Sequence, residues 1–134
     1  MLGYNKREHH TMNGWIIHKK ALGENHEVQR LVEEFEKRDV KVRVVNPKDV
    51  DIIVDRDDRK SIIVEGVPRK LPDFVLPRTG SGTTYFIKAI IRHLERLGVV
   101  LINGSEAIDA VKDKLYSQQI LGQSNLPVPK TMLV

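Results

Sequence analysis

The sequence contains no cysteine, which excludes disulfide bonds and thiolate metal sites. Aromatic residues make up only 5% of the chain, and no apolar run approaches the length of a membrane span. Residues 1–12 are polar and lack the apolar segment of a signal peptide. We therefore expect a flexible N-terminal extension over 1–12, no membrane partner and a cytoplasmic protein.

The sequence also lacks a large excess of charge of either sign. The 22 lysines and arginines exceed the 18 aspartates and glutamates by four, and the basic residues are spread along the chain. A nucleic-acid-binding protein more often has a dense basic stripe interleaved with aromatic residues, so we do not expect a nucleic-acid partner. A mild positive balance suits a pocket for anionic substrates. The 134 residues are enough for one domain with a hydrophobic core.

Short apolar runs alternate with segments of helical periodicity. This alternation predicts an α/β, Rossmann-like fold with a mainly parallel sheet and flanking helices. An appended β-hairpin is expected from two further runs on either side of the charged turn 55–60. The expected strands are 15–17, 41–45, 74–76 and 99–102 in the main sheet and 51–54 and 62–64 in the hairpin. The expected helices are 25–38, 86–97, 106–110 and 112–123.

The last residues, 131–134, form an apolar run that indicates a strand. A strand needs a partner, and no further strand follows this one in the sequence. We therefore expect the chain to be cut from something longer. Apolar surface intended for other parts of the protein would then be exposed, and self-association to a homo-oligomer is an expected result.

The segment Pro77–Thr84 is the sharpest local feature. It follows a predicted strand, precedes a predicted helix and combines two glycines with four hydroxyl side chains. In open α/β sheets, ligands bind at the edge formed by the carboxyl ends of the strands, where this segment is expected to lie. The planar guanidinium of Arg78 can form two parallel hydrogen bonds with a carboxylate or phosphate. The segment is neither a dinucleotide fingerprint nor a P-loop. The alternative interpretation is a turn in which Thr83 or Thr84 caps the helix.

Two other segments could contribute to a site. Lys114 lies in the first turn of a predicted helix, where the helix dipole disfavours a cation, so it is either solvated or close to a bound polyphosphate. Asn103 follows a predicted strand, and the simpler alternative there is a turn with Ser105 as the helix cap. His18 is expected at the same sheet edge. The sequence shows no catalytic triad, carboxylate pair or metal-ligand spacing.

The order of four segments resembles the N-terminal part of the ATP-grasp ligases, most closely the RimK-like α-L-glutamate ligases. The segments are Leu71–Gly80, Leu101–Ile108, Asp113–Leu121 and Leu126–Thr131. The likeness extends from about residue 14 to the end of the chain. It implies a Rossmann-like pre-ATP-grasp domain over 13–112, followed by the truncated start of the ATP-grasp region over 113–134.

The resemblance also implies a reaction. ATP phosphorylates a carboxylate, and an amine attacks the acyl phosphate to form an amide, with Mg²⁺ bridging the phosphates. Glutamate or a similar amino acid is joined to a protein or small-molecule acceptor. The resemblance implies substrate contacts for Arg78, Thr79, Gly80 and Asn103, and an ATP contact for Lys114. The family's adenine-binding segment and magnesium ligands lie beyond the matched region, so the chain alone is expected to be inactive.

Two alternatives remain open from the sequence. The chain could be a stand-alone α/β module that binds an anion or nucleotide without ligase activity. It could also be a phosphate-binding α/β domain unrelated to the ligases. The run of hydroxyls after Gly80 is more polar than the family pattern suggests.

Overall fold

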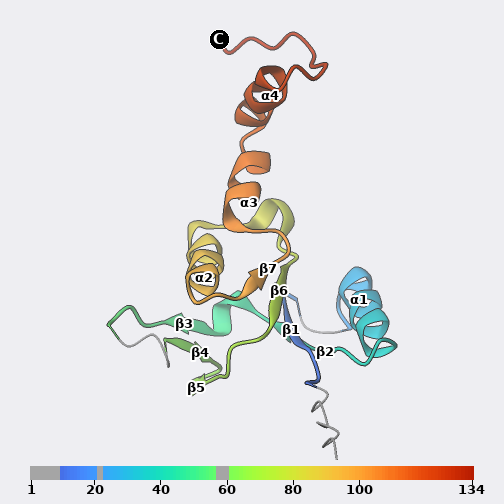
Figure 1. The fold of residues 1–134 in the computed structure, drawn as a ribbon, viewed down its shortest axis with the longest axis vertical. Helices are drawn as coiled ribbons and strands as arrows, with labels where there is room; N and C mark the ends of the chain where they lie inside the picture. Colours follow the sequence, from blue (N-terminus) through green and yellow to red (C-terminus); the bar gives the residue numbers. More distant parts are fainter. Residues whose placement is uncertain (1–9, 21–22, 57–60) are drawn as a thin grey trace, which may run out of the picture.

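The computed structural model describes residues 10–20, 23–56 and 61–134 (Figure 1). Most of the expected N-terminal extension and part of the charged turn 55–60 therefore lie outside the described residues. Met12, which is described, already belongs to the fold, because its carbonyl accepts a hydrogen bond of 3.0 Å from the Lys41 amide.

A four-stranded parallel sheet forms the centre of the molecule, with a helix on each face, as the sequence predicts (Figure 1). The strand order is β2-β1-β6-β7, so the chain returns to the middle of the sheet after its first edge strand. The strands are β1 (Asn13–Ile17), β2 (Lys41–Val45), β6 (Phe74–Pro77) and β7 (Val100–Leu101). The two covering helices are α1 (His26–Glu36) and α2 (Tyr85–Arg96).

The expected hairpin is present and gains a third short strand. A 3₁₀ turn (Pro47–Asp49) leads into β3 (Val50–Ile52), β4 (Ile62–Val64) and β5 (Val67–Pro68), which form a small antiparallel sheet of their own. A buried hydrogen bond of 2.9 Å between Ser61 Oγ and His93 Nε2 joins this sheet to α2.

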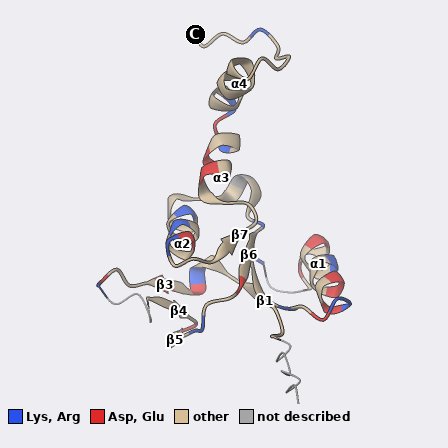
Figure 2. Ribbon diagram, in the orientation of Figure 1, with Lys and Arg blue, Asp and Glu red and all other residues tan. Residues whose placement is uncertain are grey.

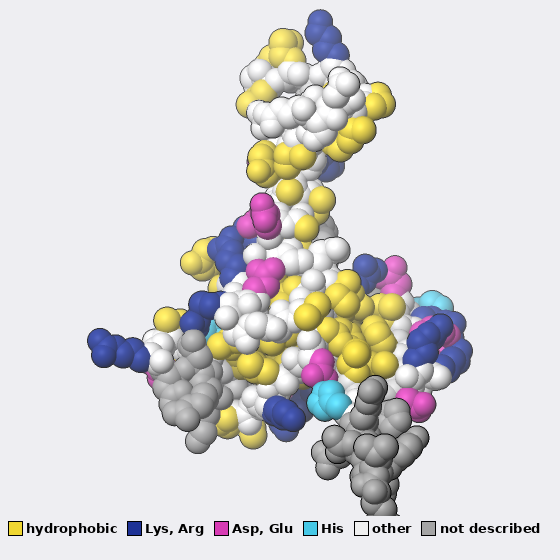
Figure 3. Space-filling view, viewed as in Figure 1, with side chains coloured by type: hydrophobic (Ala, Val, Ile, Leu, Met, Phe, Trp, Pro, Cys, Tyr) yellow, Lys and Arg dark blue, Asp and Glu magenta, His cyan; other side chains and the backbone are white. Residues whose placement is uncertain are grey.

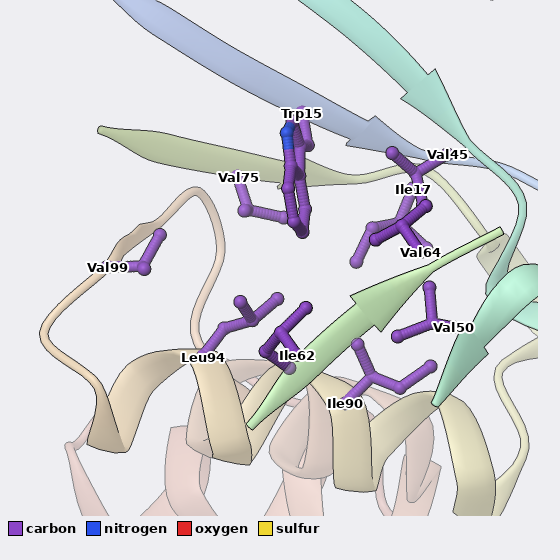
Figure 4. Packing of buried hydrophobic residues seen from close by; sticks show 10 residues of the cluster. All are labelled: Trp15, Ile17, Val45, Val50, Ile62, Val64, Val75, Ile90, Leu94 and Val99. Carbon is purple, nitrogen blue, oxygen red and sulfur yellow. The ribbon is translucent and has the colours of Figure 1, made fainter. Parts of the chain in front are cut away.

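The main core lies between the parallel sheet, α2 and the small sheet (Figure 4). Successive side chains of a strand point to opposite faces, so Trp15 and Ile17 of β1 meet Leu94 and the rest of the α2 face, whereas Ile16 points the other way. Full burial of an aliphatic side chain contributes about 1.5–3 kcal/mol. The shared core, which also contains Ile62 of β4, fixes the small sheet against the domain.

Helix α1 covers the opposite face through Val28 and Val32, which pack against Ile16. Asn25 is the N-cap, and its side chain accepts a hydrogen bond of 3.0 Å from the Val28 amide, so the predicted helix start is confirmed. In the part of the chain that the structure describes, α1 is the one helix on this face, and it packs over the β1–β2 side of the sheet.

Two further helices rise away from the sheet towards the C-terminus (Figure 1). They are α3 (Ser105–Lys112) and α4 (Lys114–Gln123), and neither contains a buried residue. Hydrophobic side chains show on the surface of this projecting part (Figure 3). The predicted cap of α3 was wrong, because Gly104 occupies the N-cap position while Ser105 donates to Glu95 instead.

The expected strand over 131–134 was also wrong. These residues are irregular, and Met132, Leu133 and Val134 are almost fully exposed. Apolar composition alone does not make a strand, because its backbone groups must pair with a neighbour. No neighbouring strand reaches this segment among the described residues. Within the same residues, no helix is both long enough and apolar enough to cross a membrane.

Candidate functional site

The carboxyl ends of three parallel strands bring the candidate residues to one edge of the sheet. The parallel hydrogen bonding continues just beyond the strands, with Arg78 N donating to Ile17 O at 2.9 Å and His18 N donating to Val45 O at 3.0 Å. Asn103 comes two residues after β7. His18, Arg78 and Asn103 therefore follow β1, β6 and β7 at the edge where α/β sheets bind ligands.

A cavity of about 800 Å³ lies at this edge. The five residues for which the resemblance implies ligand contacts all line it: Arg78, Thr79, Gly80, Asn103 and Lys114. The other lining residues are His18, Glu27, Pro77, Thr83, Ile108, Val111 and Lys112. Segments from both halves of the chain thus enclose one space large enough for a small substrate.

The loop after Arg78 is held in shape by its own hydroxyl groups. Gly80 has φ +55°, a left-handed conformation that glycine adopts without strain. The Thr79 and Thr83 hydroxyl oxygens lie 2.6 Å apart, and Thr83 Oγ1 donates to the Gly80 carbonyl at 2.8 Å. Thr84 is the N-cap of α2, which confirms one part of the simpler interpretation. The loop is both a cap and a cavity wall.

Helix α3 forms the far wall and is attached to α2 by charged groups. Lys88 and Arg92 donate to the two carboxylate oxygens of Asp109 at 2.7 and 3.0 Å, where α2 and α3 meet (Figure 2). The Lys88 ammonium, followed by Arg92, holds the pKa of Asp109 below its ordinary value of 3.8. Lys112 donates to the Thr83 carbonyl, which joins the end of α3 to the loop.

The turn before α3, at Gly104 and Ser105, is held against α2 by Glu95. Glu95 of α2 accepts hydrogen bonds from the Ser105 amide at 2.8 Å and the Ser105 hydroxyl at 2.5 Å. A Cβ atom at position 104 would overlap the Glu95 carboxylate, so Gly104 allows this close approach. The turn fixes the direction in which the chain leaves Asn103, whose exposed side chain lines the cavity.

Lys114 is the first residue of α4, and its neighbour Asp113 is the N-cap, accepting 3.0 Å from the Tyr116 amide. The predicted position of Lys114 at a helix start is therefore confirmed. Its side chain lines the cavity together with Lys112 and Arg78. Among the described residues that line this cavity, three are cations and one, Glu27, is a carboxylate.

Sequence reasoning missed two charged residues of this cavity. Glu27 lies in the first turn of α1 and pairs with Arg78 at 3.2 Å. Lys112 reaches the cavity from the end of α3. The acidic first turn was visible in the sequence, but a pairing over 51 positions was not. His18, placed as expected, accepts 3.1 Å from the Lys20 amide through its Nδ1.

Metal ligands do not gather at this edge. Within the three described ranges, no three His, Cys, Asp or Glu side chains lie close enough together to hold a metal ion. The cavity therefore does not fit Mg²⁺ by itself, whereas its three cations suit carboxylate or phosphate groups.

The RimK pre-ATP-grasp domain matches residues 15–108, which is most of the chain and includes the strands and the loop that form this edge. The chain belongs to this family. The expected fold class and the resemblance drawn from the sequence are thereby confirmed.

Relatives of this RimK pre-ATP-grasp domain carry the name probable α-L-glutamate ligase. The protein of Rhodopirellula baltica is 36% identical over 114 residues, which is 79% of this chain and 26% of that protein. The protein of Legionella pneumophila strain Corby is 34% identical over 103 residues, 77% of this chain and 34% of its own length. The chain therefore spans between a quarter and about a third of these relatives.

A solved structure supports the same fold. The ATP-grasp ligase PsnB, in a complex with a precursor peptide and AMPPNP, superimposes with a TM-score of 0.64. The match covers 90% of this chain and 46% of PsnB, at 16% sequence identity. At this identity the likeness concerns the fold.

Proposed function

We propose that this chain is the N-terminal domain of an ATP-dependent carboxylate–amine ligase of the glutamate-ligase type, which works through an acyl phosphate. The observation that carries the proposal is the cationic cavity. It lies at the ligand-binding edge of the sheet in a member of the RimK pre-ATP-grasp family, and the five residues for which the resemblance implies ligand contacts all line it.

Arg78 is proposed to bind the acceptor side of the reaction. Its guanidinium can hold a carboxylate, or the acyl phosphate made from it, through two parallel hydrogen bonds. Its backbone is fixed by the bond to Ile17, and 45% of its side chain is exposed towards solvent. Thr79, Gly80 and Asn103, which line the same cavity, are proposed to position the substrate around it.

Lys114 is proposed to contact the ATP phosphates. Its position at the start of α4, on the wall of the cationic cavity, suits a polyphosphate. Lys112 lines the same cavity and adds a second positive charge. We place the domain boundary between residues 112 and 113, a proposal supported by the break between α3 and α4.

The rest of the active site is proposed to lie outside this chain. The curated relatives are about three times as long or more, which leaves room for the adenine site and for the Mg²⁺ carboxylates that the cavity lacks. The proposed partners are glutamate or a similar amino acid and a peptide, protein or small-molecule acceptor. We propose that the 134-residue chain alone does not turn over ATP.

ADP formation tests the proposal. The full-length product of the gene should release ADP only when ATP, Mg²⁺, an amino acid such as glutamate and a carboxylate acceptor are all present, with one amide formed per ADP. The 134-residue chain, as the matched control, should release none. ADP release by the short chain alone, or none by the full-length product over a panel of acceptors, would contradict the proposal.

A further inference from the structure

The described residues that line the cavity include one carboxylate and three cations, and that carboxylate is paired with the cation proposed to bind substrate. Glu27 of α1 and Arg78, which directly follows β6, lie 3.2 Å apart. A ligand that carried only negative charge would bind better without Glu27, because like charges repel. The presence of Glu27 therefore points to a ligand that also carries a positive group.

Both side chains of the pair are accessible to a ligand. Glu27 is 72% exposed and Arg78 is 45% exposed. An ion pair this exposed is weak in water, so a ligand can separate its members at little cost. The two backbones are nevertheless fixed, since Glu27 belongs to the first turn of α1 and Arg78 is bonded to the end of β1.

The pair also stands between two hollows. Glu27 and Arg78 line the large cavity and, in addition, a hollow of about 400 Å³ that contains Leu31 and Leu76. Figure 3 shows hydrophobic surface between the centre of the molecule and the charged surface of α1. A ligand held at the pair thus has space on both sides, polar towards Lys114 and partly apolar towards Leu76.

We propose that Glu27 and Arg78 together bind the head group of an α-amino acid on the acceptor side of the reaction, with Arg78 binding the carboxylate and Glu27 accepting hydrogen bonds from the ammonium. The zwitterion replaces one internal ion pair with two, and each charge of the ligand meets its opposite. The inference rests on the proposed function only in taking the carboxylate acceptor as the ligand of Arg78, and it makes that acceptor an amino acid. It adds that Glu27 determines selectivity for molecules with an ammonium group.

Two simpler roles for Glu27 make different predictions. An acidic residue in a first turn stabilises the helix dipole, and that role alone would alter stability without discriminating between ligands. A pure competitor for Arg78 would weaken the binding of every anion, so its removal would strengthen the binding of each, and most for the ligand with the highest negative charge. Only the proposed role weakens the binding of a zwitterion when Glu27 is neutralised while leaving that of a matched dianion unchanged or tighter.

The test compares L-glutamate with glutarate, which has the same two carboxylates but no ammonium. Binding of each to the 134-residue chain is followed by NMR chemical-shift titration. In Glu27→Gln we expect L-glutamate to bind about two- to fivefold more weakly and glutarate to bind equally well or more tightly. Glu36→Gln, at the other end of the same helix, should change neither affinity.

The direction of the change in L-glutamate affinity decides the outcome. The inference is supported if Glu27→Gln weakens the binding of L-glutamate without weakening that of glutarate, while Glu36→Gln changes neither. L-glutamate binding that is unchanged or tighter in Glu27→Gln, or no L-glutamate shift at the cavity residues of the unmodified chain, would overturn it. Ligase activity is measured separately by ADP release from the full-length product, so an active ligase combined with unweakened L-glutamate binding in Glu27→Gln would overturn this inference alone.

Discussion

Gly14 illustrates how strongly a single residue can be fixed by its neighbours. It is buried in β1, adjacent to Phe74 of β6, and a Cβ atom at this position would overlap the Phe74 ring. Gly14→Ala should therefore lower the free energy of unfolding by about 1–3 kcal/mol, because an added methyl group in a packed core forces its surroundings to move. Urea unfolding followed by circular dichroism measures this change.

Gly122→Ala is the matched control for that substitution. The new methyl group would lie 3.7 Å from the Val128 side chain, an ordinary contact, and alanine favours the helix by up to about 1 kcal/mol. Its unfolding midpoint should stay the same or rise. Equal midpoints for Gly14→Ala and the unmodified chain would show that the Phe74 ring moves aside freely.

Single site residues could be predicted from the sequence where a reactive or charged side chain directly follows a predicted strand. Arg78 combines a planar cation with a place directly after a strand, and the structure puts it in the cavity. Glu27 could not be assigned in the same way, because its role depends on a partner 51 positions away. Lys112 likewise gains its place only through the packing of α3 on α2.

At the scale of elements, α3 packs against α2 without any buried residue of its own. Its attachment depends on polar contacts, with Asp109 between Lys88 and Arg92 as the central one. Asp109→Asn removes that charge, and the amide protons of α3 should then exchange roughly two- to fivefold faster. Hydrogen exchange measured by NMR at neutral pH tests this, with Asp51→Asn on β3 as the control.

The same contact predicts a dependence on pH. The folded-state pKa of Asp109 is lowered, with Lys88 as the leading cause, so its stabilising effect is fully present above the ordinary value of 3.8. It is lost as the pH falls through the lowered native value. The difference in exchange between Asp109→Asn and the unmodified chain should therefore vanish in strong acid. A difference that persists there would show that charge is not its cause.

Helices and strands could be predicted where their apolar side chains form a recognisable pattern in the sequence. The short apolar run of β1 and the helical spacing in α1 and α2 led to the correct elements, because β1 is buried on both faces and each helix buries one regular face. The apolar run 131–134 led to a wrong strand, since pairing depends on a neighbour and not on composition. The short strand β5 was missed because two residues carry no detectable period.

The whole molecule combines a well-packed sheet domain with a projecting pair of helices. The sheet domain has its own core, whereas α4 has no buried residue and exposes Tyr116 and Leu121. The curated relatives are much longer than this chain. We therefore propose that α4 belongs with the region that follows in those relatives, while the sheet domain supplies the acceptor side of the cavity.

The family was predicted from the order of four segments along the chain rather than from any single motif. The four segments that resemble the ligases lie apart in the sequence, yet residues from three of them line one cavity: Arg78, Asn103 and Lys114. Parallel strands bring their carboxyl ends together, which made this meeting predictable. The size of the cavity and its single carboxylate were not, because they follow from the packing of α1 and α3.

The most direct test of the account is the rate of ADP release by the full-length product carrying Arg78→Ala. The account predicts a loss of at least about a hundredfold in kcat/KM with an unchanged unfolding midpoint, because a cation positioned on the reacting group is removed. Arg38→Ala, which lies just beyond the C-terminal end of α1 and does not line the cavity, should retain the full rate. An unchanged rate in Arg78→Ala would contradict the claim that this cavity is part of a ligase active site.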